Sequence, residues 1–300
     1  MHIFIAYTSI ILIWSTTPLA VQWSVENDAF FGVAVRMIFG ILGCWSLIFI
    51  QKVSMPFSWK MMPIYSVTGI SLFLSMSSVY WSAQFIPSGW ISVIYGLSPI
   101  ITATFASIYL GERSFSIQRI IGMIMGFAGL WLIFSSSLEL SNQAIWGIIA
   151  CFFAVLITGI SSVWIKHLNQ TVKLSGLQTN VGGLTIALPL FIANWIIFSD
   201  VTFPDTSLRA AASMLYLRLI GTTLGFSLYY FLLKTLEATR VSLIALITPV
   251  TALLLGSWLN NEPIIAKVWL GTMLISGGLI CFEFKARKSW VQLKKYRRNI

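Results

Sequence analysis

The chain has very few charged residues for its length. Only 9% of its 300 residues are Asp, Glu, Lys or Arg, while 57% are hydrophobic, whereas soluble domains carry about 25% charged residues. This shortage excludes an ordinary soluble domain. Two histidines and three cysteines are also few, and Cys44, Cys151 and Cys281 lie far apart inside apolar runs, without the spacing of metal ligands. The sequence therefore predicts no metal and no cofactor, and a packing role for the cysteines.

Sequence motifs typical of enzyme active sites are also absent. The sequence contains no H-E-x-x-H motif, no pair of aspartates inside an apolar run and no plausible Ser–His dyad, so it does not predict an enzyme. The net charge of +10 does not indicate nucleic-acid binding, because the basic residues lie between apolar runs and in the last segment. The amino terminus lacks a basic region and a cleavage site, so we expect its apolar run to be a retained membrane span.

The dominant feature of the chain is a series of ten apolar runs. Each is about 20 residues long, which is the length that a helix needs to cross a bilayer. The sequence therefore predicts an all-α membrane protein of ten transmembrane helices. The expected spans are residues 3–22, 30–50, 61–82, 87–110, 117–136, 144–165, 175–198, 211–233, 240–259 and 264–284.

The distribution of basic residues predicts the orientation of these spans. Fifteen of the nineteen lysines and arginines fall in alternate gaps and in the tail 285–300, and only Arg209 and Lys267 fall in the other gaps. Cytoplasmic loops of membrane proteins are enriched in Lys and Arg. We therefore expect a multi-pass protein of the cytoplasmic (inner) membrane with both termini in the cytoplasm.

The second half of the chain repeats the first. Pro99 and Pro249 lie 150 positions apart, and the same offset relates Glu112 to Glu262. We therefore divide the chain into a five-helix repeat over 1–136, a second over 144–284, and a basic cytoplasmic tail over 285–300. Because five is odd, the second copy enters the membrane with opposite orientation, and inverted repeats place a substrate site between the halves and work by alternating access.

Several of these positions resemble the EamA-type members of the drug/metabolite transporter superfamily. The resemblance implies a bacterial inner-membrane carrier of small metabolites, often an exporter of amino acids or related compounds. The sequence departs from the pattern at Asn261, where the first copy has Gly111. The residues that carry the resemblance are Arg36, Pro99, Leu110, Gly111, Glu112, Arg113, Gly122, Gly126 and Gly129, then Pro249, Glu262, Gly271, Gly277 and Gly278.

Two arginines lie inside expected spans and are the main candidates for substrate binding. Arg36 and Arg218 each lie six or seven residues into a span, about 9–10 Å below its start at 1.5 Å per residue. Ionisable groups at that depth are costly and mark functional sites. Either guanidinium would bind a carboxylate or phosphate in bidentate fashion; snorkelling to the interface is the alternative. In the repeat alignment Arg36 falls over Asn180, which we include in the candidate site.

Further candidates surround these arginines in the predicted helices. Six aromatic residues are candidate pocket walls, with packing as the alternative: Trp14, Tyr80, Trp81, Tyr95, Trp164 and Tyr229. Ser98 precedes Pro99 and is a candidate ligand contact, while Pro99 and Pro249 are candidate hinges. Glu112 and Glu262 are expected to cap or pair near helix ends. The stripe Ser71, Ser75, Ser78 and Ser82 predicts close helix contact, with substrate binding as the alternative.

No acidic residue lies in the middle of an expected span. Ion-coupled carriers usually place a carboxylate or histidine there, so we expect a uniporter or exchanger, or coupling through backbone carbonyls. The predicted function is a secondary transporter that exports amino acids or related carboxylates. Its partners are a small-molecule substrate and the lipid bilayer. Import or exchange of a nucleotide-like, cofactor-like or drug-like solute, and a non-transporting sensor or assembly factor, are the alternatives; the oligomeric state stays open.

Overall fold

The protein is helical throughout its described part. The computed structural model describes residues 3–25, 28–110, 117–137, 142–172, 174–199, 207–246, 248–263 and 265–283. Within these ranges no strand occurs, and seven helical stretches are long and apolar enough to cross a membrane. The all-α membrane class is thereby confirmed.

Within the described ranges the helices form ten consecutive stretches, as the apolar runs predict. The first half contains α1 (Ile3–Ser24), α2 (Ala29–Ile50), α3 (Met62–Ser82), α4 (Ser88–Tyr95) with α5 (Ser98–Leu110), and α6 (Ile117–Ser137). The second half contains α7 (Asn142–Val172), α8 (Gly176–Phe198), α9 (Leu208–Tyr216) with η1 (Leu217–Phe226) and α10 (Ser227–Thr235), then α11 (Ala238–Ser242) with η2 (Leu243–Leu246) and α12 (Thr248–Asn260), and α13 (Ala266–Glu283).

Local sequence fixes where the second helix of each half begins. The Asp28 carboxylate accepts hydrogen bonds from the backbone N–H groups of Phe30 and Phe31, at 2.8 and 3.1 Å, and so caps α2. Ser175 and Gln178 form a reciprocal capping box at the start of α8. These caps satisfy backbone donors that no residue inside the helix can reach.

The two repeat-related prolines interrupt their spans. Pro99 and Pro249 occupy the second positions of α5 and α12 and not the middle of a continuous helix. A proline has no N–H and its ring clashes with the carbonyl four residues earlier, so the first helical turn accommodates it at the lowest cost. The fourth helix of each half is therefore divided, at residues 96–97 in the first and across η2 in the second.

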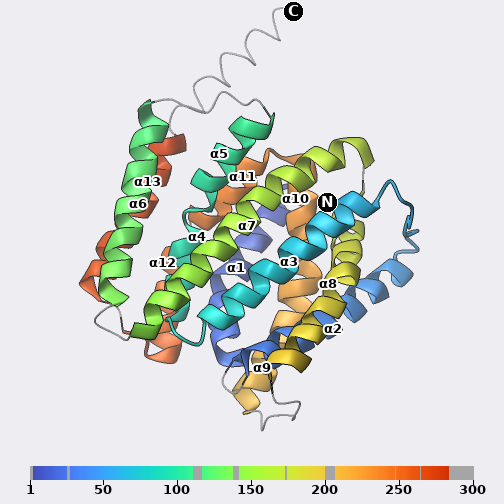
Figure 1. Cartoon of the computed structure of the whole chain (residues 1–300), viewed down its shortest axis with the longest axis horizontal. Coiled ribbons are helices and arrows are strands. Elements are labelled where there is room, and N and C mark those ends of the chain that lie inside the picture. The colour runs from blue at the N-terminus through green and yellow to red at the C-terminus, as the bar shows by residue number, and fades with distance from the viewer. Residues whose placement is uncertain are drawn as a thin grey trace, which may run out of the picture.

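The fifth helices of the two halves, α6 and α13, pack side by side (Figure 1). Gly129 lies against the backbone oxygen of Gly271, and Gly278 lies against that of Gly122. As residue numbers rise along α6 they fall along α13, so the two helices run antiparallel. Gly122 and Gly271 are equivalent positions of the two copies, and so are Gly129 and Gly278. Each contact therefore joins one copy to the other in the same way, as expected when a two-fold axis relates the copies. Small residues allow this close backbone approach in a membrane.

The first helix of each half packs beside the fourth helix of the other half. Ser15 and Trp23 of α1 bond to Thr251 and Asn260 of α12, so these two helices run parallel. The reciprocal contact joins α7 to α4 and α5. Because the first helix of each copy packs against the fourth helix of the other copy, residues of both halves are buried in one shared core.

The fourth helices show that the second copy is inverted. Gly89 packs on Leu253 and Gly96 packs on Pro249, so α4 and α12 run antiparallel. In α7, Gly147 packs beside Phe85 and Ile86 just before α4, and Gly159 packs on Ile101, so α7 is parallel to the fourth helix of the first half. The two first helices, α1 and α7, therefore run in opposite directions. The predicted inverted repeat is confirmed.

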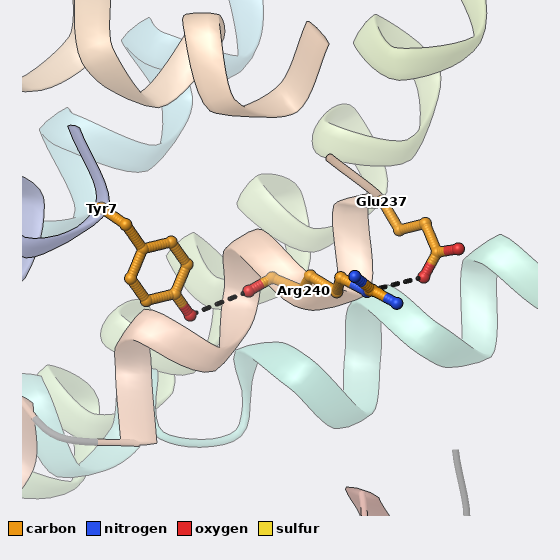
Figure 2. Close-up of polar contacts among 3 residues, drawn as sticks. All are labelled: Tyr7, Glu237 and Arg240. Atoms are coloured by element: carbon orange, nitrogen blue, oxygen red, sulfur yellow. Dashed lines mark hydrogen bonds and ion pairs between the residues drawn. The ribbon is translucent and has the colours of Figure 1, made fainter. Parts of the chain in front are cut away.

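Hydrogen bonds connect the two halves on both faces of the molecule. On the face where α1 begins, which we call the N-terminal face, the Tyr7 hydroxyl donates to the Arg240 carbonyl at 3.0 Å. Figure 2 shows this bond, with the Arg240 side chain directed away from Tyr7 and paired with Glu237 at 3.2 Å. On the opposite face, the Trp23 indole donates to the Asn260 amide oxygen at 2.9 Å.

Candidate functional site

A cavity of about 130 Å³ lies between the two halves and takes its walls from both. In α1 and α7, three pairs of the residues that face it are separated by 144 positions in the sequence, the offset that aligns the starts of the repeats. Residues at equivalent positions of two inverted copies meet only around the axis that relates them. These pairs are Trp14 and Thr158, Thr17 and Ser161, and Val21 and Ile165.

Four further pairs of lining residues come from the later helices, at the 150-residue offset. The interruptions at the prolines contribute here, because Ser98 and Thr248 begin α5 and α12 and both face the cavity. The cavity therefore lies on the pseudo-two-fold axis. The other pairs are Met76 and Phe226, Val79 and Tyr229, and Tyr95 and Ala245.

Arg36 is the only charged side chain among the described residues that line this cavity. It is 2% exposed, and its Nε donates a hydrogen bond to the Thr222 hydroxyl at 2.9 Å. Its guanidinium carbon lies 5.9 and 5.8 Å from the ring centres of Tyr80 and Phe226. Within the described ranges no carboxylate pairs with Arg36. A buried cation without a counter-ion is costly, so this site favours an anion from solution.

Thr222 connects Arg36 to its repeat counterpart Asn180. Arg36 bonds to the Thr222 hydroxyl, while the Asn180 Nδ2 donates to the Thr222 carbonyl at 3.1 Å. Asn180 is fully buried and also donates to the Ser227 hydroxyl at 3.0 Å. The cation of the first copy and the amide of the second thus stabilise one residue between them.

Thr222 lies in η1, a π-helical segment with wider turns than an α-helix. Its methyl group packs where Gly40 of α2 has no side chain, and the Thr223 hydroxyl donates to the Gly40 carbonyl at 3.3 Å. The glycine allows η1 to approach α2 closely enough for Thr222 to reach Arg36. π-Helical segments often mark functional sites, and here one holds the cavity's cation.

Aromatic side chains form the apolar part of the cavity wall. The rings of Trp14 and Tyr229 have centres 5.2 Å apart, and the Tyr229 hydroxyl shares a hydrogen bond with Ser162. The Tyr95 hydroxyl is buried in the cavity wall, beside the Thr158 hydroxyl. These groups provide a place for the apolar body of a small ligand and one further polar contact.

Comparison with known proteins identifies the scaffold that carries this cavity. The EamA-like transporter family matches twice, over residues 2–135 and 145–283. The chain belongs to the EamA-like transporter family. The protein is therefore a multi-pass membrane transporter, and the family resemblance noted in the sequence is confirmed.

Individual relatives of this EamA-like transporter agree with the family. An uncharacterized transporter, YoaV, of Bacillus subtilis is 24% identical over 96% of this chain and 99% of its own length. A probable amino-acid metabolite efflux pump of Escherichia coli is 22% identical over 67% of this chain and 69% of its own. A crystal structure with 18% sequence identity covers 94% of this chain and 98% of its own with a TM-score of 0.72, so the two share the fold.

The structure brings some of the predicted site residues of the transporter together. Four of them line the cavity with Arg36: Trp14, Tyr95, Ser98 and Tyr229. Tyr80 and Asn180 do not line it but contact Arg36 and Thr222, since the Arg36 Nη1 lies 3.5 Å from the Tyr80 hydroxyl.

Three other candidates lie away from the cavity. Arg218 is half-buried and does not line the cavity; its guanidinium lies over the ring of Phe39, 4.3 Å from its centre. Trp81 packs edge-on against Phe85, and Trp164 is 53% exposed. Their positions in the sequence are as deep as those of the lining residues, but their side chains point to other faces of their helices.

The candidate structural residues have local roles. Pro99 and Pro249 lie directly after the interruptions of their helices, next to Ser98 and Thr248 of the cavity wall. The Glu262 carboxylate accepts from the Gly89 N–H at the start of α4, at 3.3 Å, and from the Asn260 amide at 3.0 Å. A carboxylate at a helix N-terminus is favourable, so Glu262 acts as a cap. Glu112 lies outside the described residues.

Several cavity residues were not singled out from the sequence. Thr17, Thr158, Ser161 and Ser92 line the cavity, and so do Ser71 and Ser75 of the predicted serine stripe. Small hydroxyl residues are common in membrane helices, so each gives a weak signal. The 144-residue spacing of Thr17 and Ser161 is the pattern that marks them as a repeat-related pair.

Proposed function

We propose that this EamA-like transporter is a secondary carrier that exports amino acids or related small carboxylates by alternating access. The observation that carries the proposal is the unpaired Arg36 guanidinium in a cavity on the axis between the halves. The guanidinium group has paired N–H donors that can bind both oxygens of a carboxylate. The relative described as a probable amino-acid metabolite efflux pump supports the same substrate class. Both termini lie in the cytoplasm, in keeping with the distribution of Lys and Arg.

Alternating access assigns a role to the contacts on the two faces. In an inverted repeat, one half rocks against the other around a central site. The bond between Tyr7 and the Arg240 carbonyl joins α1 to α11 on the N-terminal face (Figure 2). This bond breaks when that face opens, while the Trp23–Asn260 bond stabilises closure of the opposite face.

Counterflow in proteoliposomes tests the proposal. Liposomes that contain purified protein and an unlabelled amino acid or carboxylate are diluted into the same labelled solute, without any ion gradient. Because no described cavity residue is acidic, we expect transient accumulation of label above that of protein-free liposomes. If no solute of a broad amino-acid and carboxylate panel exchanges, or if every exchange requires a proton gradient, the proposed mechanism is wrong.

Thr222→Val tests how Arg36 is positioned. Valine keeps the shape of threonine but removes the acceptor of the Arg36 Nε, and a hydrogen bond to a charged group contributes about 1.5–3 kcal/mol. We therefore expect affinity for the exchanged carboxylate to fall about tenfold, with the protein still folded. Thr185→Val is the matched control, because among the described residues the Thr185 hydroxyl bonds to the Val181 carbonyl in its own helix and not to Arg36. Equal affinities for both variants would contradict the role of Thr222.

A further inference from the structure

Five hydroxyl residues of the cavity wall share one hydrogen-bonding arrangement. Each donates its proton to a backbone carbonyl three or four residues earlier in its own helix, at distances between 2.7 and 3.4 Å. They come from α1, α3 and α7, and therefore from both halves of the transporter. We call these residues the acceptor wall: Thr17, Ser71, Ser75, Thr158 and Ser161.

The arrangement decides what the acceptor wall offers to a ligand. A hydroxyl group has one proton and two lone pairs. Because the proton is already bonded to the backbone, only the lone pairs remain available to bind a ligand. The wall therefore accepts hydrogen bonds and donates none in this arrangement, although it carries no formal charge.

The hydroxyls on α3 and α7 lie at similar heights in the membrane. These helices run antiparallel, and Gly147 of α7 lies beside the Ser82 carbonyl of α3. Ser71 and Thr158 are each eleven residues from that contact, along their own helices. They therefore lie level with one another on neighbouring helices.

Arg36 supplies the opposite chemistry in the wall of the same cavity. It contacts Tyr80 of α3, which is five residues from Ser75, or about 7.5 Å of helical rise. Arg36 and Ser75 both line the cavity, so the cation and this acceptor face the same space. Ser75 is 4% exposed and is the member of the acceptor wall on α3 closest along the helix to the cation.

We propose that the acceptor wall binds the ammonium group of a zwitterionic amino acid whose carboxylate is held by Arg36. This inference rests on the proposed transport function and narrows its substrate class. An ammonium group has three N–H donors and no acceptor, which complements a wall of lone pairs. The rings of Trp14 and Tyr229 add electrostatic attraction for a cation. The site therefore selects amino acids over carboxylates that carry an acceptor in place of the ammonium group.

Three ligands with one carbon skeleton test this selection: leucine, 2-hydroxy-4-methylpentanoate and 2-oxo-4-methylpentanoate. All three present a carboxylate to Arg36, but the second carbon carries three donors, one donor or only an acceptor. We expect calorimetric titration of the purified protein to give at least tenfold tighter binding of leucine than of the 2-oxo acid, with the 2-hydroxy acid between them. Equal or tighter binding of the 2-oxo acid, or no binding of any of the three, would overturn the proposal.

A substitution within α3 locates the effect in the acceptor wall. Ser75→Ala removes the nearest acceptor, and we expect it to narrow the ratio of leucine to 2-oxo acid affinity at least threefold. Ser78→Ala is the matched control, because the Ser78 hydroxyl also donates to its own helix, to the Leu74 carbonyl, but does not line the cavity. The inference fails if the two variants change the ratio equally.

Binding and transport also separate this inference from the function on which it rests. If leucine binds with the expected preference but does not exchange across proteoliposomes, the acceptor wall stands and the transport proposal fails. If leucine and the 2-oxo acid exchange with equal affinity, transport stands and the acceptor wall fails.

Discussion

We expect Arg36→Gln to lower affinity for carboxylate substrates by about 100-fold or more. Glutamine preserves part of the side chain's length and polarity but removes the only cation found in the described cavity wall. Loss of one partner from a buried charge pair costs about 2–5 kcal/mol, and each 1.4 kcal/mol is a factor of ten. Titration of the purified variant with leucine, and counterflow of the same solute, measure the loss.

Arg218→Gln is the matched control for this prediction. Arg218 lies at a similar depth in its span but packs against Phe39 and does not line the cavity, so we expect affinity within about threefold of the original protein. Arg36→Lys keeps the charge but loses the fork of donors, and we expect it to restore only part of the affinity. Tight carboxylate binding by a folded Arg36→Gln protein would show that another group holds the anion.

The second large effect is expected at the contact between α6 and α13. A Cβ atom at Gly271 would lie 2.7 Å from the Gly129 carbonyl oxygen and 2.8 Å from Ile133 Cγ1. Backbone atoms cannot yield as a flexible side chain does, so Gly271→Ala forces the two helices apart. Overpacking of this kind costs about 1–3 kcal/mol. We expect a lower Tm in detergent and less monodisperse protein on size-exclusion chromatography.

Gly277→Ala provides the comparison on the same helix. Its added Cβ would approach only the terminal methyl of Met125, at 3.3 Å, and alanine is the better helix former. We expect a Tm equal to or slightly above that of the original protein. Equal Tm losses for the Gly271 and Gly277 variants would mean that the α6–α13 contact is not a tight interface.

The sequence predicts the ten helices and their inversion because both depend on properties of the chain itself. Apolar run length sets which segments cross the bilayer, and an odd number of spans per copy inverts the second copy. Pro99 and Pro249 also reveal the duplication. The same residues show a limit, since an apolar run spans 87–110 continuously while the helix inside it is interrupted before Pro99. The interruption depends on how the neighbouring helices receive the freed backbone groups.

The sequence does not distinguish Arg36 from Arg218. Both are arginines six or seven residues into an apolar span, and neither has an acidic neighbour one turn away. The difference lies in which face of each helix turns inward. Gly40 lets η1 approach α2, and Thr222 then holds Arg36 beside the cavity. No local pattern encodes that approach, because it requires two segments nearly 200 residues apart to meet.

The sequence by itself determined the class, the number of spans and the duplication, because hydrophobic length and repeat spacing are properties of the chain alone. Tertiary structure decided which polar groups share one cavity and what each offers to a ligand. Whether a serine presents a proton or a lone pair depends on the carbonyl that it meets when the helix forms. Whether that serine faces a ligand depends on how the helices pack.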